Sequence, residues 1–157
     1  IQFPCMYIFT LQTFAVFVTA ALLGTKRGTI AVVVYILLGI IGVPVFAGLT
    51  GGPSVIAGPT GGFIVGFILT AIIIGLLMNL ANGKSEVVKL VITVVAMVLG
   101  DVACFAIGTV WFMVVTNNTV AVALTYCVIP YIIPDIAKIV VATIIANRVK
   151  KYVQIFN

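Results

Sequence analysis

The sequence contains no histidine, and its only acidic residues are Glu86, Asp101 and Asp135. A Ser-His-Asp triad, a paired-carboxylate active site and a metal centre of the usual ligand types all need more such side chains than this. No C-x-x-C motif joins the three cysteines, Cys5, Cys104 and Cys127. We expect them to be buried free thiols, and the alternative is a redox or metal-binding role. The chain is therefore predicted to be no enzyme and to need no cofactor.

Charge of either sign is also scarce, at 7% of the 157 residues, whereas 64% of the residues are hydrophobic. An ordinary soluble domain is about half apolar and about a quarter charged. This composition excludes a water-soluble globular domain, a nucleic-acid-binding protein and a disordered tail. It predicts a polytopic membrane protein, and at about 20 residues per helical span the chain can hold roughly five to seven spans.

Five apolar runs predict an all-α membrane protein, a polytopic bundle that forms a single transmembrane domain over residues 1–157. The runs cover residues 6–23, 29–47, 63–81, 87–115 and 120–146. Prolines interrupt the last run, and proline suits the first turn of a helix better than its interior. We therefore expect residues 120–133 to form an outer loop or partial helix, and the final span to run from near Pro134 to about Lys151.

The loops between these runs fall into two sets by charge. Basic residues follow the first and last runs and flank the start of the fourth: Lys26, Arg27, Lys84, Lys89, Arg148, Lys150 and Lys151. The alternate loops, residues 48–62 and 116–119, carry no charge. By the positive-inside rule we expect a multi-pass protein of the cell membrane, with residue 1 outside and the C-terminus cytoplasmic.

One candidate functional feature is the uncharged, glycine- and proline-rich stretch of residues 42–63. Irregular backbone at membrane depth is tolerated only where protein covers it or where it lines a cavity. The stretch is therefore predicted to be a lid or wall over an outward-facing substrate pocket. A flexible connector is the alternative.

A second candidate feature is the pair Asp135 and Lys138, which are three residues apart and so share a helix face. Ionisable residues at membrane depth usually face a cavity or one another. The pair could contact a substrate, or it could be an interfacial ion pair that caps the helix. Asp101, in the middle of the fourth run, could be a partner charge inside the bundle.

Aromatic and small residues have simpler interpretations. We expect Trp111, Tyr126 and Tyr131 near the outer membrane interface, with cavity lining as the alternative. Small residues at helical spacing are predicted to permit close helix contact: Gly39 and Gly42 in the second run, and Ala142 and Ala146 in the last.

Several motifs in order along the chain resemble one known family. They are T-L-Q-T at residues 10–13, L-L-G-T-K-R-G at 22–28, Y-I-L-L-G-I-I-G-V-P-V-F-A-G at 35–48, G-P-T-G-G-F at 58–63, G-T-V-W at 108–111 and I-P-Y-I-I-P-D-I-A-K at 129–138. This pattern resembles the BioY family, the substrate-binding S components of energy-coupling-factor biotin transporters. The family fold has six spans with both ends cytoplasmic. The resemblance therefore implies that one further helix, a docking surface for the coupling subunit, precedes this chain in the natural protein.

The resemblance also implies a function and a set of site residues. The protein would bind biotin outside the cell and deliver it inward, driven by a transmembrane coupling protein and two cytoplasmic ATPases. The implied substrate-binding residues are Asp135, Lys138, Phe46, Ala47, Gly48, Thr50, Gly58, Pro59, Thr60, Gly61, Gly62 and Tyr131. Partners would be biotin, those subunits and membrane lipid. Two alternative functions stay open. The chain could be an S component for another vitamin, or a small channel or helper subunit without a ligand.

Overall fold

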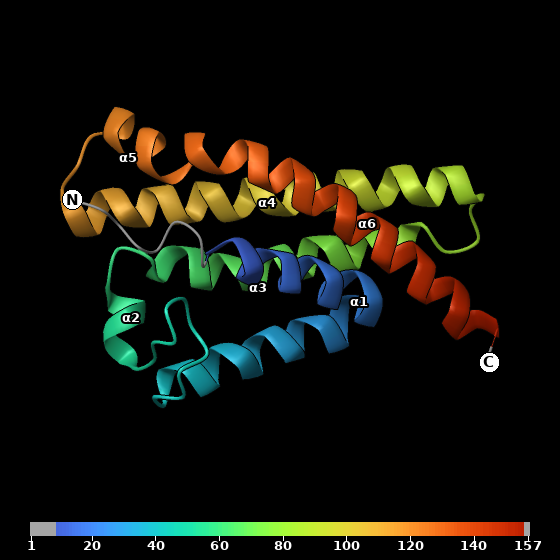
Figure 1. Ribbon diagram of the computed structural model, residues 1–157, viewed down its shortest axis with the longest axis horizontal. Coiled ribbons are helices and arrows are strands. Elements are labelled where there is room, and N and C mark those ends of the chain that lie inside the picture. Colours follow the sequence, from blue (N-terminus) through green and yellow to red (C-terminus); the bar gives the residue numbers. More distant parts are fainter. Residues whose placement is uncertain (1–8, 156–157) are drawn as a thin grey trace.

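The computed structural model of the protein describes residues 9–155, which form a bundle of helices. Its long helices are α1 (Phe9–Ile40), α3 (Gly61–Leu80), α4 (Glu86–Thr116) and α6 (Ile132–Ile155). Shorter segments connect them: α2 (Pro53–Ala57), α5 (Val120–Cys127) and the 3₁₀ turn η2 (Ile129–Tyr131). Figure 1 shows α4, α5 and α6 on one side of the bundle and α1 and α3 on the other. The predicted all-α bundle is confirmed.

Helix α1 is a hairpin of two helical halves rather than one straight rod. Gly24 has a non-helical backbone, with φ 75° and ψ −173°, and the chain reverses there (Figure 1). Gln12 Nε2 donates to Tyr35 Oη at 2.5 Å across the hairpin, whereas a straight helix would separate these residues by about 35 Å. The sequence predicted a loop over residues 24–28. That prediction is wrong in length, because only Gly24 leaves the helical conformation.

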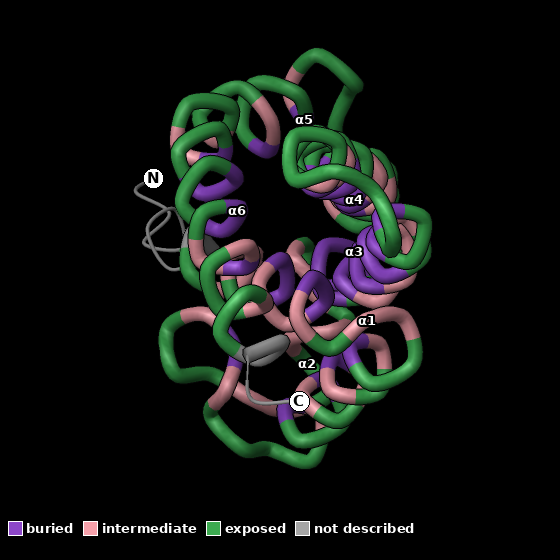
Figure 2. Tube along the Cα trace, turned by 90° about the vertical axis from the view of Figure 1, so that its right-hand side faces the viewer, coloured by how far each residue is buried: buried purple, intermediate pink, exposed green. Residues whose placement is uncertain are grey.

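The helices have the length and composition of membrane spans. Four of them are long and apolar enough to cross a membrane: Leu11–Ile40, Gly61–Leu80, Glu86–Thr116 and Val120–Tyr152. The five predicted apolar runs correspond to the two halves of α1 and to α3, α4 and α6. Buried positions face the middle of the bundle (Figure 2), while large apolar side chains such as Leu76, Val102 and Ile144 face outward. Such an apolar exterior suits lipid, and the chain is a multi-pass membrane protein.

Helix α3 lies at the centre of the packing, and small residues allow its neighbours to approach. Phe67, Ala71 and Ile74 are completely buried. A Cβ atom added at Gly75 would lie 2.4 Å from the Cα atom of Thr25 in α1, so a side chain there would push the two backbones apart. On the α4 side, Thr70 Oγ1 donates to the carbonyl of Gly100 at 2.8 Å. Close packing on both sides fixes the positions of α1 and α4.

The second predicted run ends earlier than its hydropathy suggests. Helix α1 stops at Ile40, and residues 41–47 turn back over it rather than continuing to residue 47. Gly42, with φ 104°, belongs to this turn. A Cβ atom on Gly39 would lie 2.0 Å from the Phe46 ring. The prediction that Gly39 and Gly42 serve helix–helix contact is therefore wrong, because Gly39 admits an aromatic ring from the loop. Ala142 and Ala146 are fully buried within the bundle, as predicted.

The proline-containing segment follows the sequence expectation with one shift. Residues Val120–Cys127 form the expected partial helix, and α6 begins at Ile132, two residues before Pro134. Cys104 and Cys127 are buried free thiols, which confirms that prediction for both. Cys5 lies outside the described residues.

Candidate substrate-binding site

The beginning of α6 carries a buried pair of opposite charges. Lys138 Nζ forms an ion pair with Asp135 Oδ1, and the two residues are only 8% and 3% exposed. Pro134 has a backbone suited to a helix start, and Asp135 is favoured near the positive end of the helix dipole. The predicted shared face is confirmed. Because both side chains are buried inside the bundle, they are not an exposed cap at the membrane surface.

Two other helices bring polar groups to this pair. Lys138 Nζ donates to Thr13 Oγ1 of α1 at 2.7 Å. Asp101, at the midpoint of α4 and 8% exposed, lies at the level of this pair, because the Phe105–Tyr131 ring contact and the Thr143–Met97 hydrogen bond join α4 to α6 on either side of it. We call Thr13, Asp101, Asp135 and Lys138 the charge cluster. The sequence did not assign Thr13 or Asp101 to the site, although an acid in the middle of an apolar run was a signal.

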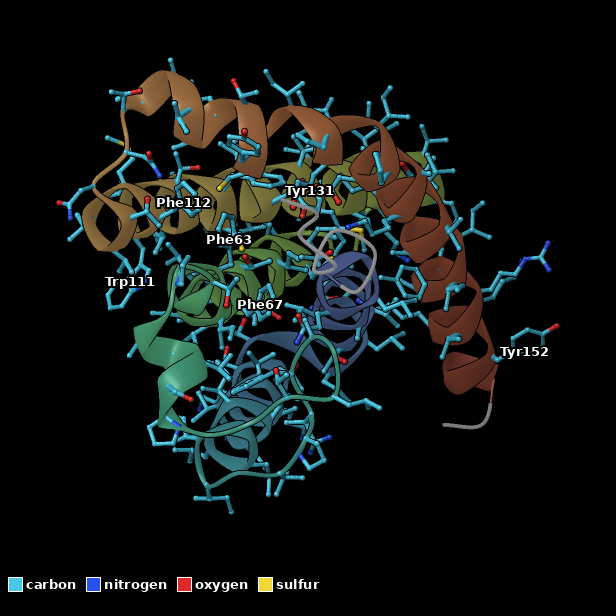
Figure 3. All side chains as sticks on the ribbon, turned by 60° about the vertical axis from the view of Figure 1, so that its left-hand side comes forward. Phe63, Phe67, Trp111, Phe112, Tyr131 and Tyr152 are labelled. Atoms are coloured by element: carbon cyan, nitrogen blue, oxygen red, sulfur yellow. The ribbon has the colours of Figure 1, made fainter. Side chains whose placement is uncertain are left out.

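A row of aromatic rings starts one helical turn from the charge cluster, because Phe105 follows Asp101 by four residues and Tyr131 precedes Asp135 by four. The ring centroids of Tyr131 and Phe105 are 6.3 Å apart, and those of Phe105 and Phe63 are 6.2 Å apart. Cys104, the neighbour of Phe105, donates its thiol to the carbonyl of Phe63 at 3.5 Å. Figure 3 shows Phe63 and Tyr131 over the interior of the bundle, whereas Tyr152 points away near the far end of α6. The structure thus brings Tyr131 to the α4 side of the site.

The predicted residues Gly58–Gly62 lie against α4. Trp111 Nε1 donates to the carbonyl of Gly58 at 3.0 Å, and a Cβ atom on Gly62 would lie 2.2 Å from the Cβ atom of Trp111. The carbonyl of Thr60 accepts the backbone N–H of Phe63 at 3.1 Å, at the start of α3. Gly61 is buried and Pro59 exposed. These contacts give the segment a packing role at the entrance to α3.

Three of the other predicted loop residues, Phe46, Ala47 and Gly48, line a separate cavity of about 600 Å³ between the two halves of α1 and the following loop. Its lining is Leu11, Gln12, Ala15, Val16, Thr19, Ala31, Val32, Tyr35, Pro44, Val45, Phe46, Ala47, Gly48 and Leu49. Tyr35 Oη donates to the carbonyl of Val45 at 2.9 Å and so holds the loop to α1. Thr50 Oγ1 donates to the carbonyl of Ala47 at 2.7 Å and shapes the turn.

The predicted site is therefore divided into two regions, with the first half of α1 between them. Thr13 contacts the charge cluster, while its neighbour Gln12 contacts Tyr35 in the cavity. Within the described residues, Gln12 Oε1 and Thr109 Oγ1 are buried and have no hydrogen-bond partner. Buried acceptors of this kind can receive N–H groups from a ligand. The sequence had assigned neither residue to the site.

Comparison with known proteins identifies the family. The family model described as the BioY family matches residues 1–155. The chain belongs to the BioY family. Two similar BioY proteins are a biotin transporter of Thermotoga maritima and a probable biotin transporter of Pyrococcus horikoshii. The first is 43% identical over 91% of this chain and 80% of its own length, and the second is 37% identical over 90% and 79%.

A solved structure supports the same BioY assignment. It is the S component for biotin from an ECF-type ABC transporter, and it superposes with a TM-score of 0.78 at 26% identity. The match covers 90% of this chain and 74% of the other. The bundle described above has the S-component fold.

Proposed function

We propose that this chain is the biotin-binding S component of an energy-coupling-factor importer. The observation that carries the proposal is the buried Asp135–Lys138 pair, tied to α1 through Thr13, in a member of the BioY family. Buried ionisable groups are costly inside a membrane and are usually functional. The relatives named above are biotin transporters, and the similar solved structure is an S component for biotin.

The chemistry of the site suits biotin. Biotin has a ureido ring with N–H donors and a carbonyl acceptor, an apolar thioether ring and a valerate carboxylate. Asp135 can accept a ureido N–H, and Lys138 can donate to the ureido carbonyl or pair with the carboxylate. The rings of Phe63, Phe105 and Tyr131 offer an apolar wall beside these groups. A few polar groups on mainly apolar walls are typical of small-molecule sites.

The proposed orientation follows from the two ends of the bundle. Figure 1 shows the turn at Gly24, the α3–α4 loop and the C-terminal end of α6 at one end, and residues 41–60 at the other. The first end carries Lys26, Arg27, Lys84 and Lys151. The positive-inside rule therefore supports a cytoplasmic C-terminus in the cell membrane, with residues 41–60 outside. Biotin would enter from that outer side.

The chain would bind but not catalyse, and energy would come from a coupling protein and two cytoplasmic ATPases. The test is calorimetric titration of the detergent-purified protein with biotin, thiamine and riboflavin. We expect tight binding of biotin alone. Equal binding of the three vitamins, or tight binding of another one, would replace the biotin assignment. Binding of none would favour a channel or helper subunit.

Asp135→Asn tests whether the carboxylate contacts the ligand. The substitution keeps the shape but replaces a pure acceptor with a mixed donor and acceptor, so we expect roughly tenfold weaker biotin binding. Glu86→Gln is the matched control, because Glu86 is an exposed acid at the first residue of α4, about four turns away from the cluster residue Asp101. If Asp135→Asn lowers thermal stability but leaves the biotin dissociation constant unchanged, Asp135 is a structural residue.

We further propose that the turn over residues 47–51 closes the site. The backbone N–H of Gly52 donates to the carbonyl of Gly39 at 2.7 Å, and Gly58 is held by Trp111, so residues beyond the turn are anchored. Leu49, at the tip, is 83% exposed and has a positive φ of 56°.

A cysteine at position 49 should react with an impermeant thiol reagent from outside, and more slowly with biotin present. A cysteine at Val87, at the opposite end, is the control; equal labelling with and without biotin would contradict closure.

A further inference from the structure

Asp101 is a buried acid near the site that the proposed function leaves without a role. It lies on α4 opposite Asp135 and Lys138 on α6, because contacts between these helices flank it one turn away on each side, at Phe105 and at Met97. Its carboxyl group interacts with that of Asp135. Lys138 is close to both acids. The charge cluster therefore contains two acidic groups and one ammonium group inside an apolar bundle.

The contact between the two acids has a chemical requirement. An ionised carboxylate is only an acceptor of hydrogen bonds, so two carboxyl groups can share one only when a proton lies between them. A buried net charge is also costly unless it is paired. One proton on the two acids would satisfy the hydrogen bond and, together with Lys138, make the cluster neutral.

We propose that Asp101 is a positioning residue, whose protonated carboxyl group donates to Asp135 and holds that carboxylate against Lys138. The other charged groups that act on Asp101 come from α6. Its own helix adds the buried thiol of Cys104. On the neighbouring helices, Thr13 of α1 accepts from Lys138, and Thr70 of α3 donates to the carbonyl of Gly100, the residue before Asp101.

The consequence for ligand binding rests on the proposed function. Loss of the shared proton would leave the cluster with a net negative charge. That charge would repel the valerate carboxylate of biotin and draw Lys138 away from Asp135 towards Asp101. Asp101→Asn should prevent this, because an amide can donate to Asp135 at every pH and carries no charge.

The proton is tested directly by infrared spectroscopy of ligand-free protein labelled with ¹³C in the aspartate carboxyl group. Asp101 and Asp135 are the only aspartates of residues 1–157, so every labelled band that these residues contribute belongs to this pair. At neutral pH we expect one protonated-carboxyl band and one carboxylate band. Asp101→Asn should remove the protonated band and keep the carboxylate band. A wild-type spectrum with two carboxylates, or a protonated band that persists in Asp101→Asn, would overturn the proposal.

The positioning role is tested by biotin titrations from about pH 6 to pH 9, a range in which the biotin carboxylate stays ionised. In the wild type, affinity should fall about tenfold as the protonated band disappears and stay constant wherever the band is constant. Asp101→Asn should remove this dependence on pH, so that its affinity, whatever its value at pH 6, varies by no more than about twofold up to pH 9. A wild-type affinity that changes independently of the band would refute the role. Absence of biotin binding at every pH, with the band present, would instead reject the proposed function and leave the proton assignment intact.

Discussion

The charge cluster and the α1 cavity differ in how the chain assembles them. The cluster joins residues from α1, α4 and α6, and its Lys138–Thr13 hydrogen bond connects positions 125 residues apart. The cavity is lined by α1 and the loop directly after it, between Leu11 and Leu49. One region depends on the correct packing of the whole bundle, whereas the other is a local product of one hairpin and its loop.

This difference suggests how function is divided between them. Charged groups held by three helices can fix the orientation of a ligand, because moving any one of them requires repacking the bundle. A loop held by a few hydrogen bonds to its own hairpin can open without disturbing the rest. We therefore expect substitutions in the cluster to change affinity most, and substitutions around the cavity to change mainly stability and access.

The largest effect should come from Lys138→Met, which keeps the length of the side chain and removes its charge. In the proposed site Lys138 would donate to biotin, and truncating one partner of a buried charged contact across a binding interface costs about 2–5 kcal/mol of binding energy. We expect biotin affinity to fall at least about thirtyfold by calorimetry. Lys84→Met, in the exposed α3–α4 loop, is the matched control and should bind normally. Similar affinities for both variants would remove Lys138 from the site.

Gly39→Ala should affect the cavity without touching the cluster. The new methyl group would overlap the Phe46 ring and push the loop off α1, which typically costs about 1–3 kcal/mol. We expect a lower melting temperature and faster labelling at position 49, with biotin affinity reduced by less than in Lys138→Met. Adding Phe46→Leu should recover much of the lost stability, since it removes the overlapping ring atoms. A melting temperature equal to that of the wild type would contradict the packing described here.

Tyr35→Phe should have a smaller effect in the same region. It removes the hydroxyl that accepts from Gln12 and donates to the carbonyl of Val45. The loss of these part-buried hydrogen bonds should cost about 1–2 kcal/mol of stability. Tyr152→Phe, on an exposed position of α6, should change the melting temperature little. If Tyr35→Phe weakens biotin binding as strongly as Lys138→Met, the cavity itself holds the ligand, and the division of roles is wrong.

The smallest effect is expected for Trp111→Phe, which tests whether α4 links the loop to the cluster. The variant removes one hydrogen bond to the carbonyl of Gly58 and keeps an aromatic ring beside Gly62. We expect a stability loss of about 0.5–1.5 kcal/mol and an unchanged biotin dissociation constant. A clear loss of affinity would mean that the second anchor of the loop also positions the site.

Much of this fold could be predicted from the sequence, because membrane helices are recognisable from the length and apolar composition of their sequence segments. The halves of α1, α3, α4 and α6 match the five apolar runs, and Pro134 marked the start of α6 to within two residues. The turn at Gly24 was located by the charged residues after it, but its length was not, because residues 25–28 stay helical. The end of α1 at Ile40 could not be located, because the turn after it includes Gly42 with a positive φ inside an apolar run, where hydropathy does not change.

The candidate site was harder to predict than the fold. Asp135 and Lys138 could be paired from their spacing alone, since they lie on one helix. The contribution of Thr13 and Asp101 requires knowledge of which helices are neighbours, and spacing along the chain does not provide it. The glycines of residues 58–62 were assigned to the ligand, whereas two of them, Gly61 and Gly62, make close backbone contacts that explain them without one.

The hairpin of α1 also has a consequence for the surrounding lipid. Its second half, residues 25–40, is only about 24 Å long, whereas the 31 residues of α4 extend about 46 Å. The hydrocarbon core of a bilayer is about 30 Å thick. The α1 side of the protein is therefore too short for the membrane and the α4 side too long. A bilayer adjusts to such a mismatch by thinning beside short helices and by tilting long ones. The bilayer around this protein should consequently differ in thickness from one side to the other, and it should be thinnest where the hairpin meets the acyl chains.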